Sequence, residues 1–580
     1  MGELMKRMND YAVQNEAICR KNDHIDPRLY EEFGVNRGLR DENGKGVLTG
    51  LTKISRIVSS CVKDGEKVPC DGELWYRGYK VEKLIGNLGE EQLGFELEFY
   101  MLPADAAETR TKVALMATSK EELPDVLVVD GHLTNEMILQ YGSSGFFLPL
   151  NDYLADASKM PNYNAIPAED KEIMERAQTM ADGNMYGLAA YEPETWNLTP
   201  NRIFINKAWL DKLGLKEPTT TEELKEVLIA FRDGDPNGNG VQDEIGVYGF
   251  SGGGYGENTS AALMNSFVFW NGGGINGGLS LSDDGTTVIA PFTTEEWRDG
   301  LRYMNDLYKE GVLSANIFTD DGTQFKAILN QETPIVGLTT AGSLSNWPDV
   351  INNKNFLEME MIAPLKGPKG IQYTPYSEYT PGQELMILAS TDKLDMALKF
   401  ADQFYDHDTS IIERFGEENV DWTRDPEILA QHTNAYVEAG LYDGLSMLVT
   451  STVWADNQSQ TWRNHGPRYA SLEMGNTVYD FSSGRPFDPD DPTQLNAKCY
   501  ELYYDKHPEK VLPALKYTIE EAEQIQDQLT TIPDFVKQSL AEFVTGARDI
   551  EGGWDTYLKE LDNMGLQQWI ATAQTAYDRS

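Results

Sequence analysis

The alternation of apolar and polar residues is clearest from about residue 96 onward. Leu97–Tyr100 alternates as a β-strand does, and Asp105–Ser119 has the pattern of a helix. Leu123–Asp130 is an almost unbroken apolar run, typical of a parallel strand that is covered on both faces. A helix is expected through Met137–Leu139. The order strand, helix, strand, helix predicts an α/β fold with a parallel sheet.

The first 95 residues have a different pattern, in which turn clusters separate short β-like runs. Glu73–Tyr76 is such a run and a helix is expected from Val81, so this part is a small mixed α+β segment. Leu74–Tyr76 would pair in parallel with Leu97–Phe99, because strand, helix and strand here have the length of a βαβ unit. The alternative is that residues 1–92 form an appendage outside the sheet.

Composition and charge also change near residue 95. The chain has 580 residues, enough for two or three domains, and a formal net charge of −44, which argues against nucleic-acid partners. The first 95 residues hold 15 basic and 16 acidic residues, so nearly all of the negative charge lies beyond them. Three of the four cysteines lie in the first 70 residues, and Cys499 alone lies in the acidic part, as suits a chain kept outside the cell. Residues 1–95 and 96–580 are therefore expected to be separate parts.

The N-terminal part resembles the N-terminal region of citrate synthase over residues 20–95. The motifs that carry the resemblance are Asn36-Arg37-Gly38-Leu39-Arg40-Asp41, Thr49-Gly50-Leu51-Thr52 and Leu74-Trp75-Tyr76-Arg77-Gly78-Tyr79. The catalytic histidines and aspartate of that family come from much later in its chain, and the resemblance does not continue past residue 95. This resemblance implies a citrate-synthase-like fragment that is inactive in acyl transfer, joined as a chimera to the acidic part.

Motifs beyond residue 96 resemble the extracellular solute-binding proteins of bacterial ABC sugar importers, in particular the large lipoprotein subgroup with alginate- and oligosaccharide-binding members. They occur in order along some 485 residues: Leu123–Gly131, Gly145–Leu154, Gly183–Leu188, Phe204–Leu215, Pro364–Pro368 and Gly552–Trp569. The resemblance implies two α/β lobes of the periplasmic-binding-protein type, with a hinge and an interlobe cleft. Lobe 1 would take residues 96–195 plus a later return, and lobe 2 would largely take residues 200–370.

One loop has the residue types of a calcium site. Oxygen-bearing side chains converge within ten residues, and calcium takes six to eight oxygen ligands. The candidate ligands are Asp235, Asn237, Asn239, the carbonyl of Val241, Asp243 and Glu244. The twelfth position is Gly246 where an EF-hand has Glu, so the loop resembles instead the shortened calcium loop of the binding-protein subgroup. The alternative is a polar Asn-Gly turn. A structural calcium ion is expected, since the loop leaves little room for an activated water.

No sequence pattern marks a catalytic centre. The HExxH and Walker A motifs do not occur. Gly249-Phe250-Ser251-Gly252-Gly253 has the form Gly-x-Ser-x-Gly, but it lies in a glycine run that is typical of a loop, and a glycosidase-like pair of carboxylates is not excluded among 93 acidic residues. The chain is therefore interpreted as a binding protein and not an enzyme.

Several aromatic residues lie in polar, loop-like stretches, where a sugar site would need them. Sugars stack an apolar ring face on aromatic side chains and bind polar groups through their hydroxyls. The candidates for ligand binding are Trp196, Trp270, Trp347, Tyr379, Trp454 and Arg463. For each one taken alone, a core or surface role is equally compatible with the sequence.

The partners implied by the resemblance are an oligosaccharide or other sugar and the membrane permease of an ABC transporter. The family is extracellular or attached to the cell surface. The sequence as given has neither a signal peptide nor a lipobox at its start, so by itself it would be expected to stay in the cytoplasm.

Overall fold

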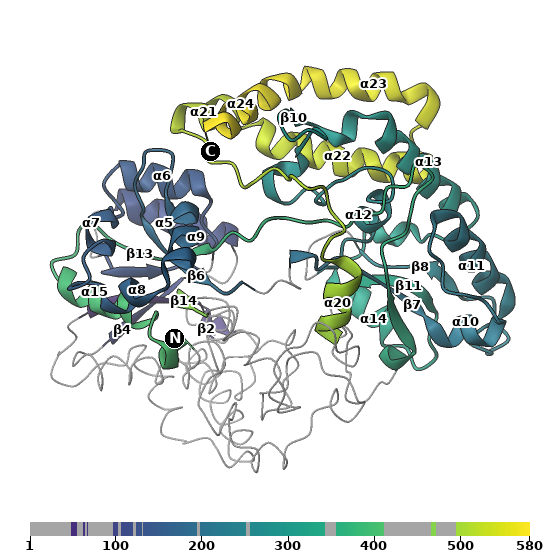
Figure 1. Ribbon diagram of the computed structural model, residues 1–580, viewed down its shortest axis with the longest axis horizontal. Coiled ribbons are helices and arrows are strands. Elements are labelled where there is room, and N and C mark those ends of the chain that lie inside the picture. Colours follow the sequence, from purple (N-terminus) through teal and green to yellow (C-terminus); the bar gives the residue numbers. More distant parts are fainter. Residues whose placement is uncertain are drawn as a thin grey trace, which may run out of the picture.

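The computed structural model describes the chain in segments. The backbone is described for residues 48–54, 62–63, 66–67 and 97–102, and the structure then covers residues 106–119, 123–129, 131–193, 198–250, 256–342, 355–410, 466–470 and 495–579. Figure 1 shows two α/β lobes, with C-terminal helices lying over the second. Within the described residues, no helix has the length and apolar character that a membrane crossing requires.

Lobe 1 is built on a four-stranded sheet of order β14-β6-β13-β5. Its strands are β5 (Val126–Val128), β6 (Gly187–Tyr191), β13 (Gly382–Ile387) and β14 (Arg468–Tyr469). Its helices are α5 (Ala106–Thr118), α6 (Asn135–Ser143), α7 (Asn151–Leu154), α8 (Pro161–Ala165), α9 (Ala168–Gln178) and α15 (Leu394–Gln403). The sheet is mixed and not all parallel, because β13 returns from lobe 2 and runs antiparallel to β5 and β6.

Lobe 2 is built on a second four-stranded sheet, of order β12-β7-β11-β8. Its strands are β7 (Arg202–Asn206), β8 (Ile245–Val247), β11 (Val336–Ala341) and β12 (Met359–Ile362), with the hairpin β9 (Ser280–Leu281) and β10 (Val288–Ile289) beside it. Its helices before the return to lobe 1 are α10 (Lys207–Leu213), α11 (Thr221–Gly234), α12 (Thr259–Met264), α13 (Glu295–Lys309) and α14 (Gly322–Leu329), with 3₁₀ turns at Ile275–Gly278, Pro291–Thr293, Ala315–Phe318 and Asn355–Glu358. Thr220 caps α11, because its Oγ1 accepts a hydrogen bond from the backbone N–H of Glu223 at 3.1 Å.

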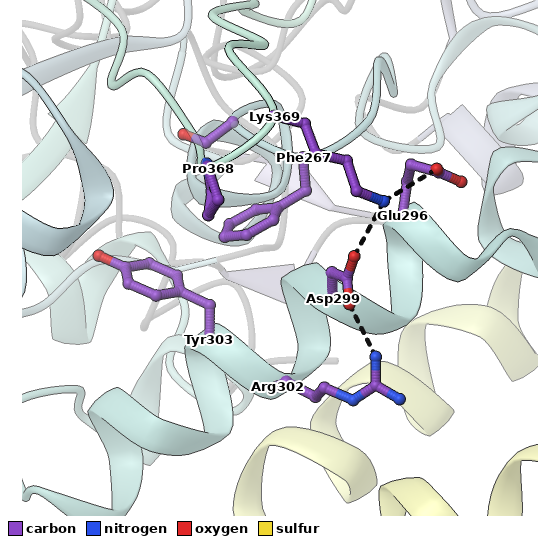
Figure 2. A pocket seen from close by; sticks show the side chains of 8 residues that line it. Phe267, Glu296, Asp299, Arg302, Tyr303, Pro368 and Lys369 are labelled. Atoms are coloured by element: carbon purple, nitrogen blue, oxygen red, sulfur yellow. Dashed lines mark hydrogen bonds and ion pairs between the residues drawn. The ribbon is translucent and has the colours of Figure 1, made fainter.

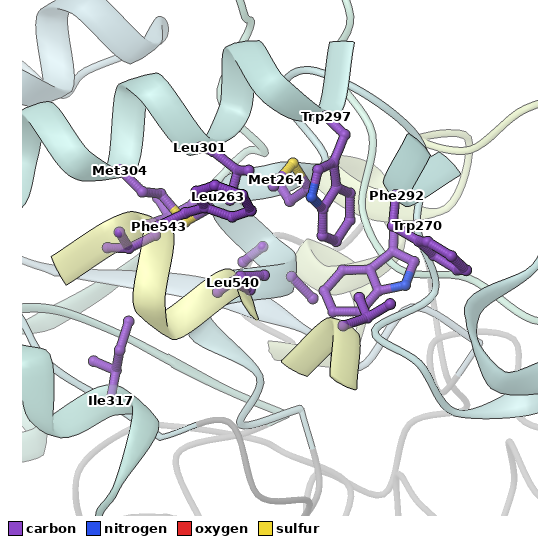
Figure 3. Close-up of a cluster of buried hydrophobic side chains, with 14 of the residues drawn as sticks. Leu263, Met264, Trp270, Phe292, Trp297, Leu301, Met304, Ile317, Leu540 and Phe543 are labelled. Atoms are coloured by element: carbon purple, nitrogen blue, oxygen red, sulfur yellow. The ribbon is translucent and has the colours of Figure 1, made fainter. Parts of the chain in front are cut away.

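The C-terminal helices belong to the core of lobe 2. They are α20 (Leu495–Tyr503), α21 (Ile519–Ile525), α22 (Gln528–Thr545), α23 (Ile550–Asn563) and α24 (Leu566–Arg579). Figure 3 shows Leu540 and Phe543 of α22 packed among Trp297, Leu301 and Met304 of α13. Trp554 of α23 and Trp569 of α24 lie in the same core and are 5% and 0% exposed. Lobe 2 thus extends well beyond residue 370.

The N-terminal part supplies three described strands: β1 (Leu48–Ile54), β2 (Val62–Lys63) and β3 (Glu66–Lys67). β1 pairs in parallel with β4 (Leu97–Leu102), from Leu48 opposite Leu97 to Ile54 opposite Leu102. Residues 48–54 therefore form a strand beside β4, and the predicted pairing of Leu74–Tyr76 lies outside the described residues. A boundary at residue 95 would separate these two paired strands.

Candidate functional site

Each sheet is joined to the segments that cross between the lobes at the edge where the carboxyl ends of neighbouring strands lie. β5 and β6 both run antiparallel to β13, so their carboxyl ends lie at one edge of lobe 1. In the first crossing, Glu192 and Pro193 follow β6 at that edge, and residues 198–201 precede Arg202, which lies opposite Ala341 at the carboxyl end of β11 in lobe 2. Ligands of open α/β sheets bind outside the carboxyl ends of strands. The side chains at these two edges therefore form the candidate site.

A cluster of tyrosines and one carboxylate lies at the lobe 1 edge. The hydroxyl of Tyr191 donates to Asp170 Oδ1 at 2.6 Å, and the hydroxyl of Tyr469 donates to Asp170 Oδ2 at 2.7 Å. The two rings are stacked, with centroids 5.7 Å apart and planes 16° apart. Burial raises the pKa of both phenols, and the hydrogen bonds to Asp170 raise it further, so both remain protonated donors.

Tyr379, one of the predicted ligand residues, is part of the same cluster. It lies on the return crossing, residues 363–381, and its ring meets Tyr191 edge-on at 5.6 Å. Its hydroxyl accepts a hydrogen bond from the backbone N–H of Glu192 at 2.5 Å and donates to the carbonyl of Ala190 at 3.3 Å. Tyr379 therefore joins the two crossings where they leave lobe 1.

A buried ion pair lies beside these tyrosines. Arg468 Nε donates to Glu192 Oε2 at 2.9 Å, and the two side chains are 7% and 9% exposed. A charged pair this well covered is held in a fixed geometry, since a buried charge without its partner is costly. The pair connects β14 to the first residue of the first crossing.

Polar groups also gather at the lobe 2 edge. Asn201 Nδ2 donates to the carbonyl of Asn258 at 3.0 Å, and Thr374 Oγ1 donates to the carbonyl of Asn201 at 3.1 Å. Gly256 has a φ of 75°, and a Cβ at this position would overlap the carbonyl oxygen of Pro200. Asn201 Oδ1 is buried and has no hydrogen-bond partner among the residues that the structure describes. This edge therefore retains hydrogen-bonding capacity next to the first crossing.

The remaining predicted ligand residues are not brought to these edges. Trp270 is 6% exposed in the core of lobe 2, and its ring meets Trp297 edge-on with centroids 4.9 Å apart. Both faces of an indole buried in this way are covered by protein, so Trp270 is placed as a core residue and not as a sugar platform. Four further candidates lie outside the described residues: Trp196, Trp347, Trp454 and Arg463.

Sequence reasoning missed Asp170, Tyr191 and Tyr469. Tyr191 ends an apolar strand and Tyr469 follows Arg468, but only the fold brings Tyr469 to Asp170, 299 residues away. The available signal was the position of Tyr191 at the carboxyl end of the run Gly187–Tyr191, just before the first crossing.

The predicted calcium loop follows α11 directly. Asp235 ends the helix with a φ of 46°, and its carboxylate accepts hydrogen bonds from the backbone N–H of Gly240 at 3.2 and 3.3 Å. The side-chain amides of Asn237 and Asn239 donate to the carboxylate of Asp243 at 3.0 to 3.1 Å. These amide N–H groups take the positions around the Asp243 carboxylate that a bound cation would take. No cluster of three or more His, Cys, Asp or Glu with metal-holding geometry occurs within the described residues, so an ion here needs amide and carbonyl oxygens as well.

Glu244 is the feature of this loop that fits a cation. It is 7% exposed, and neither carboxylate oxygen has a hydrogen-bond partner within the described part of the chain. Burial raises the pKa of Glu244 and the carboxylates of Asp243 and Asp235 raise it further, whereas the nearby backbone N–H groups of Glu244 itself and of Asn237 lower it in part. A bound divalent cation would compensate this unpaired charge. Val241, whose carbonyl was the other predicted ligand, has a side chain that is 57% exposed.

A separate pocket of about 320 Å³ lies on lobe 2 (Figure 2), between α13 and the loop that holds Pro368 and Lys369. Lys369 Nζ lies 3.1 Å from both Glu296 and Asp299, and Arg302 binds Asp299 at 2.7 Å. Its charges are therefore paired with one another, and none of the tyrosines or strand ends described above contributes to it. We place the candidate site at the sheet edges and not in this pocket.

Residues 82–409, more than half of the chain, match the bacterial extracellular solute-binding proteins. The chain belongs to this family. The match begins at residue 82, inside the part that was expected to be separate. Members of the family are solute-binding proteins, which agrees with the expectation that the chain is not an enzyme.

Relatives of this solute-binding protein are found in Streptococcus and Bifidobacterium. The fructooligosaccharide ABC transporter substrate-binding protein FusA of Streptococcus pneumoniae is 25% identical over 508 residues, which cover 86% of this chain and 87% of FusA. The structure of FusA in complex with kestose has a TM-score of 0.68 at 22% identity and covers 92% of this chain and 99% of FusA. An extracellular solute-binding protein from Bifidobacterium longum subsp. infantis has a TM-score of 0.69 at 22% identity, over 93% of this chain and 99% of its own. These likenesses confirm the two-lobed, periplasmic-binding-protein-like fold.

Proposed function

We propose that this protein is the solute-binding component of an ABC importer and binds an oligosaccharide between its two lobes. The observation that carries the proposal is the half-buried group of Tyr379, Tyr469 and Asp170, which lies at the edge of lobe 1 where the crossings attach and is backed by the buried ring of Tyr191. Stacked aromatic rings beside a carboxylate suit the apolar faces and hydroxyl edges of a sugar. The similarity to FusA, whose structure holds kestose, supports this choice of ligand.

Titration calorimetry against a panel of oligosaccharides that includes kestose tests the proposal. At least one sugar should bind reversibly and be recovered intact. Tyr469→Ala should weaken its binding by about tenfold or more, a loss of about 1.4 kcal/mol. Tyr308→Ala, the same change on α13 in lobe 2, is the control and should bind as the parent does. Release of shorter sugars would favour a glycosidase instead, and equal effects of the two variants would remove the tyrosine cluster from the site.

A structural calcium ion in the loop Asp235–Glu244 is the second part of the proposal. Asp235, Asn237, Asn239, Asp243 and Glu244 would hold it through side-chain oxygens, and Val241 through its carbonyl. The unpaired, buried carboxylate of Glu244 supports this assignment. A further structure of FusA is of an EF-hand mutant, with a TM-score of 0.68 and 21% identity.

The permease of the importer is the proposed protein partner. The N-terminal resemblance to citrate synthase rests on sequence motifs alone. We propose no catalytic role for that part, since the motifs do not include the catalytic residues of that enzyme.

A further inference from the structure

A short C-terminal segment makes non-covalent contacts with both lobes. Leu515 and Tyr517 are 4% and 6% exposed in the core of lobe 2, whereas Ile519 packs against the core cluster of lobe 1. In Figure 1 the start of α21 lies above α6 of lobe 1, and residues of α21 and α6 are in contact. Residues 515–519 thus pass from the core of lobe 2 to the core of lobe 1 within five positions.

Lys516 lies between these apolar residues and points to lobe 1. Its Nζ donates to the carbonyl of Thr179 at 2.6 Å and also to the carbonyl of Arg176, at the carboxyl end of α9. The last carbonyls of a helix have no partner within the helix, and the helix dipole favours a cation there. One side chain therefore satisfies a helix end in the opposite lobe.

The backbone of Lys516 is fixed to lobe 2. Its carbonyl accepts a hydrogen bond from Arg579 Nη2 of α24 at 2.8 Å, and Arg579 also binds both carboxylate oxygens of Glu521 at 2.7 and 2.8 Å. If the backbone of Lys516 were mobile, the residue could move together with lobe 1 and keep its side-chain contacts at little cost. With its backbone held in this way, relative movement of the lobes must stretch or break the contacts of its side chain.

We propose that Lys516 is a latch that holds the two lobes in the relative orientation of this structure. Hinge motion of the lobes then requires the contacts of Lys516 and Ile519 with lobe 1 to give way. Both the ammonium and the neutral amine can donate two N–H groups to two carbonyls, so the latch is a fixed contact and not a pH switch. The inference concerns the C-terminal segment and is independent of the nature of the ligand.

Distances between the lobes test the latch directly. Spin labels on Lys399→Cys of α15 and Lys309→Cys of α13, both exposed, report the separation of lobes 1 and 2 in a background without other cysteines. Lys516→Met keeps the length of the side chain and removes its donors, so the distance distribution should broaden or shift. Lys537→Met, the same change at an exposed position of α22, should leave the distribution of the parent.

An unchanged distribution in Lys516→Met would overturn the proposal. If Lys516→Met does not fold, Arg579→Gln provides the second test, because it frees the backbone of Lys516 while its side chain stays in place. Broadening in Arg579→Gln would support the latch, and the distribution of the parent would refute it.

Discussion

Glu244→Gln separates a calcium site from a polar turn most sharply. Without an ion, the parent keeps a carboxylate that is 7% exposed and has no hydrogen-bond partner within the described residues. A buried carboxylate without a partner costs more than a buried neutral amide, so Glu244→Gln should stabilise the calcium-free protein. With calcium at about 100 times its Kd, binding should stabilise the parent by about 2.7 kcal/mol, and Glu244→Gln should lose most of this gain. Relative to the parent, Glu244→Gln should therefore be more stable without calcium and less stable with calcium.

Thermal unfolding in excess calcium and in chelator measures both effects. For a unit the size of lobe 2, about 2.7 kcal/mol corresponds to a rise of roughly 5–10 °C in the Tm of the parent. In chelator, Glu244→Gln should unfold above the parent, and in calcium below it. Glu226→Gln, the same change at an exposed position of α11, should follow the parent in both conditions.

The reasoning fails if chelation leaves the Tm of the parent unchanged, since the loop would then be a polar turn. It also fails if Glu244→Gln keeps the full calcium response while a double substitution Asp235→Ala, Asp243→Ala removes it. That result would place an ion in the loop without using the carboxylate of Glu244.

Three further outcomes are expected. Trp297→Ala removes a side chain that is 1% exposed in the lobe 2 core, and should cost about 3–5 kcal/mol in urea denaturation; a loss below 1 kcal/mol would contradict this placement. Burial lowers the pKa of Lys516 from 10.5 to about 8, so the unfolded chain binds more protons between these values and the stability of the parent should rise with pH there; Lys516→Met should show a flatter profile. The purified chain should not condense acetyl-CoA with oxaloacetate, and measurable release of the CoA thiol would support the hypothesis of a citrate-synthase-like enzyme instead.

The sequence by itself determined those features that depend on local order along the chain. The apolar run Leu123–Asp130 contains the buried strand β5, Thr220 caps α11, and the helical spacing of Trp554 and Trp569 placed them in the core. These features follow from periodicity and capping, which act over a few residues. The motifs beyond residue 96 also identified the family, which the match over residues 82–409 confirms.

Only the tertiary structure decided which distant segments meet. β13 enters lobe 1 antiparallel because the chain returns from lobe 2, and this direction has no signal in its residues. Trp270 looked like an exposed platform in a polar stretch, yet its ring packs against Trp297 in the core. Asp170 and Tyr469 meet across 299 positions, and Lys516 reaches Thr179 across 337. Periodicity tells which face of an element is buried, whereas the partner of that face depends on the path of the whole chain.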